Sequence, residues 1–341
     1  MKTILKLSTL LFILISLNSV NAQSKENNYD NFLNETIKEI KASYIFPDVA
    51  NKTADAIAEH QASGKYNGLN KKNFAKTLSK DLVEASGDKH FNVMHAPTYD
   101  SSSTNEKKAN TFSLTDKRTN YGFDEVKRLK GNIGYIKASV FADTKPSEEA
   151  LASAMNFISN TSALIIDVRH HIGGSGETVM MFLGYFFPEK TLVSKAYFRH
   201  DNSSIESWTD EKVLGKKYLN KPVYILVGGR TISASEAFAY NLQQYDLATI
   251  VGTKTYGAAN PVGGVTVDDF NLFIPIGNET NTITKTNWEG VGLQPDVKSE
   301  SALETSQILA LKNFLKNNPK GSDLSEKEIK TRIQELKNSK K

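Results

Sequence analysis

Apolar positions along the chain form two kinds of pattern, and their order predicts an α/β core. Leu164 to Val168 and Val223 to Val227 are largely apolar runs of strand length without alternation, which is typical of strands buried on both faces of a sheet. Helical patterns lie between and after these runs, so we expect a sheet covered by helices on both sides. The other elements expected here are a strand beginning at Ile133 and helices over Glu148–Ile158, Glu177–Phe186 and Ala234–Tyr245.

The N-terminal region has a purely helical pattern and is expected to form a small cap domain. Apolar residues between Phe32 and Tyr44 recur at helical spacing, a second helix is expected after Pro47, and a third runs from Lys72 to Val83. Residues 96–110 are rich in Ser, Asn and Lys without periodicity. That composition indicates an exposed loop or linker.

Towards the C-terminus the pattern changes twice. Val265 to Ile276 alternates around Asp268 and Asp269, which predicts an antiparallel excursion from the core. A helix is expected from Leu303, and it is expected to pass into a lysine-rich solvated tail. The patterns divide the chain into a signal peptide (1–22), an N-terminal helical cap domain (23–95), a linker and entry to the core (96–131), a core domain (132–315) and a lysine-rich C-terminal helix or tail (316–341).

The first 22 residues have the pattern of a secretory leader. Lys2 and Lys6 precede an apolar centre from Leu7 to Leu17, and the small-residue motif Val20-Asn21-Ala22 follows. The apolar part is too short to span a bilayer comfortably, although an uncleaved N-terminal anchor is the alternative. We therefore expect an exported protein, periplasmic or secreted, with no stable membrane anchor. The chain has no cysteine, so neither a lipid-anchored Cys nor a disulfide framework is available.

Composition and charge exclude little and point to no cofactor. The 341 residues are 39% hydrophobic, enough for one large core or two moderate ones, and the formal charge of +4 comes largely from C-terminal lysines. Nucleic acid is therefore not expected as a partner.

His60 and His200 are expected to face solvent. His170 and His171 are adjacent, so on an extended chain they point to opposite sides, and no metal or cofactor is expected.

The segment from Lys221 to Gly257 is the most suggestive of chemistry. Gly228 and Gly229 end an apolar strand, a short loop follows, and a helix begins near Ala234. Ser233 stands at this junction, where unpaired N–H groups and the positive end of the helix favour developing negative charge. The alternative is structural, because Ser233 with Glu236 three residues later also matches a capping box that merely starts the helix.

Three further positions are candidates, each with a structural alternative. His90 lies just after the helical cap region and could accept a proton, but a single histidine there is more often structural. Glu289 lies beside Trp288 in a glycine-punctuated loop and could orient a histidine, or it could be a solvated loop residue. Gly173 and Gly174 follow a buried strand, where their N–H groups could face a ligand or simply form a turn.

Four segments, in order along the chain, together carry a family resemblance. They are the apolar stretch VKRLKGNIGYIKASVF, the D-x-R-x-x-x-G-G strand end at Asp167, the SASE stretch at Ser233 with VGTKTYG downstream, and the E-G-x-G-x-x-P-D loop at Glu289. The set resembles the C-terminal-processing (tail-specific) serine peptidase family from about Tyr44 to Val297. The stretches Tyr44–Ala50 and Asp88–His90 resemble the branch shared with interphotoreceptor retinoid-binding protein and the tricorn-type peptidases.

The resemblance implies a fold and a set of catalytic residues. The fold is α/β, a ClpP/crotonase-like β-α core with a small N-terminal helical domain, and no peptide-binding PDZ domain is expected between residues 92 and 132. The core domain then corresponds to a tail-specific-protease-like catalytic domain. By resemblance, Ser233 is the nucleophile, His90 the general base and Glu289 the orienting carboxylate. Relatives with a Ser/Lys dyad carry a lysine where this chain has Ala258, so that dyad is absent.

The resemblance also implies an oxyanion hole made of main-chain N–H groups. These come from Ala234 and from Gly173 or Gly174. The family usually has Asn where His171 stands. Either the histidine substitutes for it by hydrogen bonding, or the loop is altered.

Two functions of different classes follow from these residues. The first is an exported serine peptidase that hydrolyses peptides or unfolded proteins through an acyl-enzyme on Ser233. The second is a non-catalytic protein on the same fold that binds a hydrophobic ligand or a peptide. The partner in the first case is a peptide or protein substrate, and the oligomeric state is left open.

Overall fold

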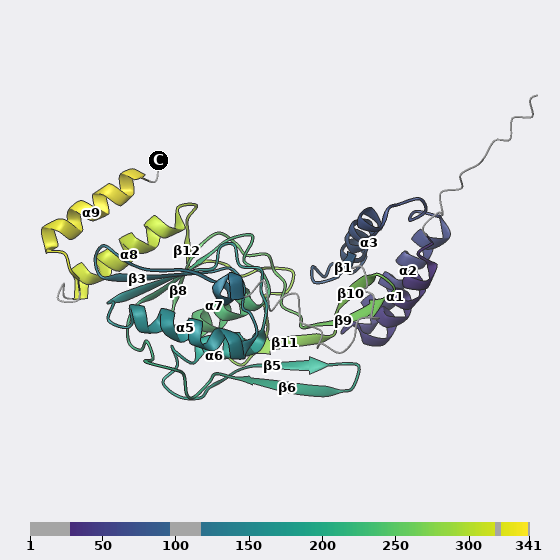
Figure 1. The fold of residues 1–341 in the computed structure, drawn as a ribbon, viewed down its shortest axis with the longest axis horizontal. Coiled ribbons are helices and arrows are strands. Elements are labelled where there is room, and N and C mark those ends of the chain that lie inside the picture. Colours follow the sequence, from purple (N-terminus) through teal and green to yellow (C-terminus); the bar gives the residue numbers. More distant parts are fainter. Residues whose placement is uncertain (1–27, 96–116, 318–321, 340–341) are drawn as a thin grey trace, which may run out of the picture.

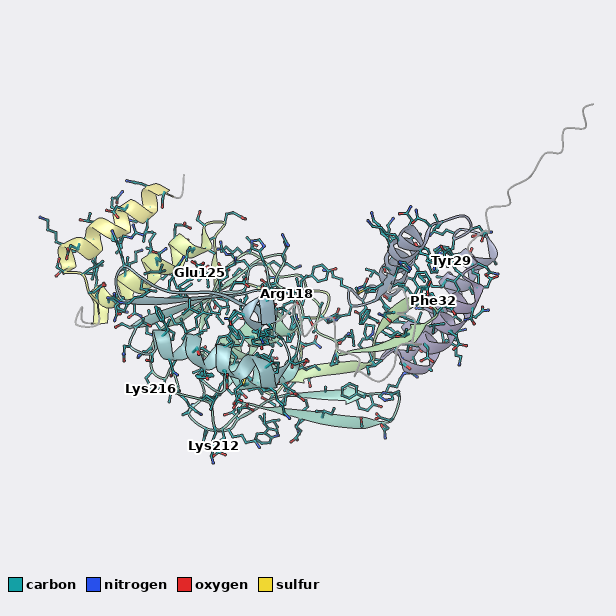
Figure 2. All side chains as sticks on the ribbon, in the orientation of Figure 1. Tyr29, Phe32, Arg118, Glu125, Lys212 and Lys216 are labelled. Carbon is teal, nitrogen blue, oxygen red and sulfur yellow. The ribbon has the colours of Figure 1, made fainter. Side chains whose placement is uncertain are left out.

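The computed structural model of the protein describes residues 28–95, 117–317 and 322–339. The expected signal peptide and most of the expected linker lie outside these residues. The described chain forms a larger lobe around a central sheet and a smaller lobe built on three helices (Figure 1). Tyr29 and Phe32 lie in the smaller lobe, whereas Lys212 and Lys216 lie at the edge of the larger one (Figure 2). No helix among the described residues has the length and apolar character needed to cross a membrane.

Within the described residues, six strands form the central sheet of the larger lobe. Their order is β12-β8-β7-β4-β3-β2, and every neighbouring pair is parallel except β2 with β3. The strands are β2 (Phe123–Leu129), β3 (Ile133–Ala138), β4 (Ala163–Asp167), β7 (Val223–Val227), β8 (Thr249–Gly252) and β12 (Val297–Lys298). The α/β core expected from the uninterrupted apolar runs is confirmed, because β4 and β7 are buried at every position.

Helices cover both faces of this sheet, as the absence of alternation predicted. One face carries α5 (Thr144–Ile158), α6 (Gly176–Leu183) and α7 (Ala234–Gln244), and the other carries α8 (Ala302–Asn317) and α9 (Glu326–Ser339). Ile166 packs in the core beneath α5, α6 and α7, and its neighbour Ile165 packs in the core beneath α8 and α9. Each fully buried side chain of this size contributes about 1.5–3 kcal/mol, so both layers stabilise the sheet.

The expectation of a solvated tail after the first C-terminal helix is wrong for residues 326–339. They form α9, and Ile329, Ile333 and Leu336 are buried against the sheet-facing core. These three residues stand four and three positions apart among lysines, so they share one face of the helix. The many charged residues of this segment, glutamates as well as lysines, obscured its amphipathic pattern in the sequence.

The smaller lobe combines the N-terminal helices with a hairpin from much later in the chain. Its elements are α1 (Asp30–Ser43), α2 (Pro47–Ala62), α3 (Lys71–Ser86), β1 (Asn92–His95), β9 (Val262–Val267) and β10 (Phe270–Pro275). The three expected helices and the expected antiparallel excursion are confirmed. β10 pairs with both β1 and β9, and Phe270 packs on Phe32 and Phe74 inside the lobe. The hairpin therefore completes the core of the N-terminal lobe.

A third sheet lies beside the junction of the two lobes. It contains β5 (Leu192–Phe198), β6 (Ser203–Trp208) and β11 (Gly277–Asn281), in the order β11-β5-β6. At the tip of the β5–β6 hairpin, Arg199 donates hydrogen bonds to the carbonyl oxygens of Lys41, Ala42 and Tyr44 at 2.8–2.9 Å. A cation on these last carbonyls suits the negative end of α1. The hairpin is thereby attached to the smaller lobe.

Candidate active site

Ser233 stands on a tight turn between β7 and α7. Its backbone has φ 59° and ψ −122°, a left-handed conformation that costs a non-glycine residue on the order of 1–3 kcal/mol. Its carbonyl oxygen accepts the N–H of Glu236 at 2.7 Å, and its own N–H donates to the Glu236 carboxylate at 2.9 Å. The strained conformation is thus held by hydrogen bonds on both sides of the residue.

Glu236 joins the Ser233 turn to the segment that follows β8. The side chain is fully buried and accepts N–H groups from Gly257 at 2.7 Å and from Ala258 at 3.0 Å, besides that of Ser233. Burial raises the pKa of this carboxyl group, and these donors with the Thr255 hydroxyl oppose the rise. The capping-box pattern in the sequence correctly marks a helix start, and its glutamate also fixes the neighbouring loop.

His90 reaches the centre of the molecule from the smaller lobe. α3 ends at Gly87, whose φ of 75° turns the chain, and the N–H of His90 donates to Asp88 Oδ1 at 3.0 Å. Its imidazole Nδ1 lies 3.9 Å from Glu289 Oε2, and the side chain is only 10% exposed. Burial lowers the pKa of His90, while the negative charge of Asp88 acts in the opposite direction. The ring is therefore neutral at neutral pH.

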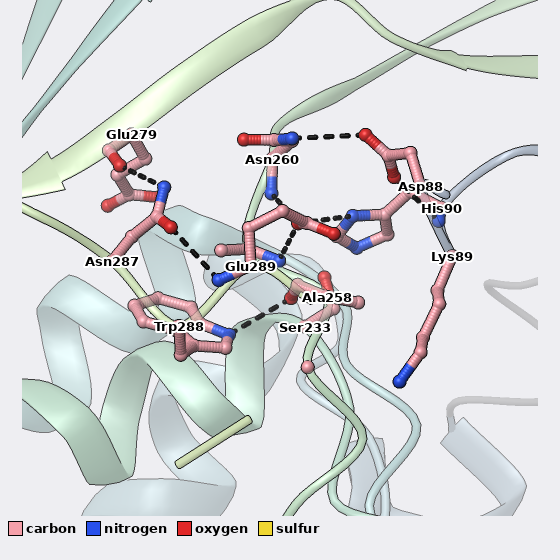
Figure 3. A network of polar contacts seen from close by, with 12 residues as sticks. Asp88, Lys89, His90, Ser233, Ala258, Asn260, Glu279, Asn287, Trp288 and Glu289 are labelled. Carbon is pink, nitrogen blue, oxygen red and sulfur yellow. Dashed lines mark hydrogen bonds and ion pairs between the residues drawn. The ribbon is translucent and has the colours of Figure 1, made fainter. Parts of the chain in front are cut away.

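Glu289 faces this imidazole from the larger lobe (Figure 3). Its Oε2 accepts the N–H groups of Ala259 at 2.6 Å and Asn260 at 3.0 Å. Burial and the nearby charge of Asp88 raise the pKa of Glu289, and these backbone donors partly offset the rise. The two residues, about two hundred positions apart in sequence, are brought together in one buried spot.

The Ser233 hydroxyl and His90 are not hydrogen-bonded to each other in this structure. Neither ring nitrogen of His90 has a hydrogen-bond partner among the described residues. Ser233 lies in the same close-up view as the His90–Glu289 pair (Figure 3). The structure therefore shows a close histidine–glutamate pair with the serine in the same region.

Asp88 is a buried site residue that the sequence reasoning did not single out. Its Oδ2 accepts the Tyr44 hydroxyl at 3.3 Å and the Asn260 side-chain amide at 3.0 Å, while Oδ1 holds the His90 backbone. The side chain is 3% exposed. An aspartate two positions before a candidate histidine was the available signal, but its partners come from segments that only the fold brings together.

The two glycines after β4 pack closely, Gly173 against the Ser233 turn and Gly174 against the backbone of Phe141. A Cβ built on Gly173 would lie 3.0 Å from the Cβ of Ser233, and one on Gly174 would lie 2.1 Å from the Phe141 carbonyl oxygen. Their φ angles of 96° and 129° also suit glycine. The Gly173 N–H donates to His171 Nδ1 at 3.1 Å. His171 therefore holds this loop by a hydrogen bond, one of the two possibilities that the sequence left open.

His171 is a buried structural residue, and its neighbour is exposed. Its ring lies 4.1 Å from the ring of Phe141, and burial lowers its pKa to about 3. His170 faces solvent, so the pair points to opposite sides. His200 is exposed and His60 half-buried against Asp81. Among the described residues, the group whose potential metal-ligating atoms come within 4.8 Å of one another is Asp88, His90 and Glu289.

A cleft of about 900 Å³ opens beside Ser233. Gly174, Ser233 and Ala234 line it, together with the exposed side chains of Ile205 and Trp208 on β6. A volume of this size suits a peptide segment of a few residues. The cleft therefore places the serine and two candidate N–H groups at one accessible surface.

Comparison with known proteins places the chain in a family. A model of peptidase family S41 matches residues 132–299, and a model described as the N-terminal domain of peptidase S41 in eukaryotic IRBP matches residues 25–124. The chain belongs to peptidase family S41. The resemblance seen in the sequence is thereby confirmed, both for the core and for the N-terminal lobe.

Curated relatives of this S41 chain include two carboxyl-terminal-processing proteases. The protein from Synechocystis sp. is 32% identical over 126 residues, which are 37% of this chain and 28% of the relative. The one from Bartonella bacilliformis is 27% identical over 191 residues, 52% of this chain and 41% of the relative. The chain thus spans less than half the length of these relatives.

Two solved structures match the S41 chain over most of its length. A lipoprotein from Streptococcus agalactiae is 12% identical with a TM-score of 0.56, covering 84% of this chain and 97% of that one. A putative peptidase from Parabacteroides merdae is 18% identical with a TM-score of 0.55, covering 91% and 97%. At these identities the likeness concerns the fold alone.

The S41 chain carries no lysine at the place used by the Ser/Lys relatives. Ala258 occupies it, fully buried, and its carbonyl oxygen accepts the Trp288 indole N–H at 3.1 Å. Lys254 is exposed. His90 is a nearby ionisable side chain that is 10% exposed and whose pKa burial lowers.

Proposed function

We propose that this chain is a serine peptidase that hydrolyses peptide bonds through an acyl-enzyme on Ser233. His90 acts as the general base and Glu289 orients it. One observation carries the proposal: His90 and Glu289, from different lobes, meet in a buried spot 3.9 Å apart near the turn that presents Ser233 to a cleft. Family membership and the carboxyl-terminal-processing relatives support the same chemistry.

The first step is attack of the Ser233 hydroxyl oxygen on the substrate carbonyl carbon. The proton passes to a free ring nitrogen of His90, which is neutral at neutral pH because burial lowers its pKa. The imidazolium then gives this proton to the leaving amine, and the acyl-enzyme remains. A water molecule then attacks the carbonyl carbon of the acyl-enzyme, again with His90 as the base, and the acid product is released. Catalytic hydrogen bonds are often long before substrate binds, so the serine and the ring approach each other in the complex.

The negative oxygen of each tetrahedral intermediate is stabilised by main-chain N–H groups. We propose Ala234 and Gly174 as the donors, because both line the cleft with Ser233. Gly173 is less suited, since its N–H is engaged by His171. Removing one such donor typically costs about 3 kcal/mol of transition-state stabilisation.

The substrate class and location are part of the proposal. We propose peptides or unfolded proteins as substrates, because the cleft is open and its wall offers apolar side chains at Ile205 and Trp208. We also propose export, to the periplasm or beyond the cell, because residues 1–22 have the leader pattern.

The decisive experiment uses the Ser233→Ala variant. We expect it to lose hydrolysis of an unfolded protein substrate and labelling by a serine-reactive fluorophosphonate, with an unchanged circular dichroism spectrum. Ser153→Ala is the matched control, because Ser153 is exposed on α5 outside the cleft. Undiminished hydrolysis by Ser233→Ala overturns the proposal. Absence of both hydrolysis and labelling in the wild-type protein favours the alternative, a binding protein on the same fold.

A further inference from the structure

Four of the ten buried polar side-chain atoms that lack a partner among the described residues lie at one place in the molecule. Among the described residues, the side-chain atoms in this state include both ring nitrogens of His90, Oε1 of Glu289 and Oδ1 of Asn260. Each buried polar atom left unpaired costs on the order of 1–3 kcal/mol. Their concentration indicates a site that receives a ligand.

The same place carries negative charge that no lysine or arginine neutralises among the described ion pairs. Asp88 and Glu289 both lie beside His90, and their bonded partners are hydroxyl, amide and backbone donors. Lys89 turns away from the pair and donates to the Tyr256 carbonyl oxygen at 2.6 Å (Figure 3). A buried and a half-buried carboxylate without a countercharge favour a bound cation.

The donor types select the kind of cation. One imidazole and two carboxylates are ligands of Zn²⁺, whereas Ca²⁺ and Mg²⁺ prefer oxygen ligands alone. One ligand atom from each of the three residues lies within 4.8 Å of the others. Tetrahedral Zn²⁺ requires separations of roughly 3.4 Å, so the widest separation of 4.8 Å must close by roughly 1.4 Å.

The surroundings already orient these ligands. Asp88 is held by Tyr44 and Asn260, and Glu289 by the N–H groups of Ala259 and Asn260. In known metal sites, loss of hydrogen bonds of this kind to the ligating side chains typically lowers metal affinity by roughly 10–100-fold. The cluster therefore has both the ligands and their supports.

We propose that Asp88, His90 and Glu289 form a binding site for Zn²⁺ or a similar divalent transition metal, and that its binding switches the peptidase off. The metal ion would occupy the nitrogen lone pair that His90 needs for the serine proton. Metal binding stands on the geometry alone, and the inhibition rests on the proposed function.

Direct binding tests the site. Equilibrium dialysis of the folded full-length chain against Zn²⁺, and the visible absorption of bound Co²⁺, give the stoichiometry, the affinity and the coordination. We expect one tight site, weakened at least about 10-fold in Glu289→Gln and in His90→Gln. The ligand substitutions keep side-chain size, and circular dichroism with the melting temperature establishes that each variant is folded.

A matched control comes from the second histidine–aspartate pair. His60 lies 3.3 Å from Asp81, but Lys65 already neutralises that carboxylate at 2.8 Å. His60→Gln should therefore leave Zn²⁺ affinity unchanged. The proposal is overturned if folded Glu289→Gln and His90→Gln bind Zn²⁺ as wild type does, if His60→Gln loses affinity equally, or if wild type binds no metal and the buried atoms bind only water.

A third measurement separates this inference from the proposed function. Ser233→Ala should bind Zn²⁺ as tightly as wild type, because the serine is not a ligand. Wild-type hydrolysis should fall with a midpoint equal to the measured dissociation constant, and a chelator should restore it. Metal binding without any wild-type hydrolysis would refute the peptidase and keep the site. Hydrolysis that is insensitive to bound Zn²⁺ would refute the switch.

Discussion

Two glutamates of the site, the buried Glu236 and the half-buried Glu289, differ in how their carboxylate oxygens are bonded. Glu236 accepts N–H groups from Ser233, Gly257 and Ala258 and the Thr255 hydroxyl, so both carboxylate oxygens are fully used. Glu289 accepts two backbone N–H groups on one oxygen and leaves the other without a partner among the described residues. The comparison shows how one residue type is assigned to structure in one case and left available for chemistry in the other.

The two carboxylates differ in whether one oxygen remains free to accept a further hydrogen bond. A saturated carboxylate fixes the segments that it joins, since moving any of them leaves a buried donor unpaired. A carboxylate that keeps a free oxygen beside an imidazole can stabilise the positive charge that the ring gains during proton transfer. Four substitutions break or sharpen this distinction.

The largest expected effect is on stability, in Glu236→Ala. Four buried donors lose their acceptor, so we expect a loss on the order of 3–5 kcal/mol in the free energy of unfolding, measured by urea denaturation. Activity should fall as well, because the Ser233 turn loses its support. Glu59→Ala, at an exposed position of α2, should change stability by less than about 0.5 kcal/mol. Equal stability of the two variants would contradict a structural role for Glu236.

Glu289→Gln should show the reverse profile. The amide retains an oxygen for the N–H groups of Ala259 and Asn260, so we expect less than about 1 kcal/mol of lost stability. Loss of the negative charge beside the imidazole should lower kcat by roughly 10²–10⁴-fold. Steady-state kinetics on a peptide substrate checks this. A large stability loss with unchanged kcat would assign Glu289 to the structural class with Glu236.

Asp88→Asn should have an intermediate effect. Both oxygens of Asp88 accept hydrogen bonds, and an asparagine has only one acceptor oxygen. The backbone N–H of His90 should therefore be held less firmly, and the free energy of unfolding should fall by about 1–2 kcal/mol. For a positioning residue, kcat should fall about 10-fold while KM stays constant, because the substrate cleft is untouched. A change in KM alone would argue against positioning of His90.

The last expected effect depends on pH and concerns His171. Its pKa is about 3 in the folded protein and near 6.5 when unfolded, so the unfolded chain binds the proton first as the pH falls. Its neutral form thus contributes stability above pH ~6.5 that is lost towards acid, about 2 kcal/mol between pH 7 and pH 5. Urea denaturation at both pH values should show a smaller loss in His171→Asn. The exposed-site control His200→Asn should retain the wild-type slope.

The core elements could be predicted from the sequence, and some of their partners could not. β4 and β7 were evident because an apolar run of that length fits a covered strand. β10 was expected as antiparallel, but its pairing with β1, with Val93 opposite Leu272, has no local signal. The α9 face was missed because charged residues of both signs surround its apolar positions. Pairing partners far apart in sequence are fixed by packing, which a local pattern does not encode.

The site divides in the same way. His90 and Glu289 were proposed together from a resemblance, and the structure brings them into contact range. Asp88 and Asn260 were not proposed, because a polar residue acquires its partner only when two lobes meet. The roles of Ser233, His90 and Glu289 stay predictions that the substitutions above test.

The hairpin of residues 262–275 sets an order of events during synthesis. Helices α1 to α3 are synthesised before the hairpin, yet Phe270, Leu272 and Ile274 of their core are translated long after His90. In a nascent chain the smaller lobe is therefore incomplete, and we expect His90 to take its position only after the hairpin has been synthesised. Glu289 lies after the hairpin in the sequence, so the proposed proton-transfer pair assembles only once a segment far downstream of His90 has been synthesised.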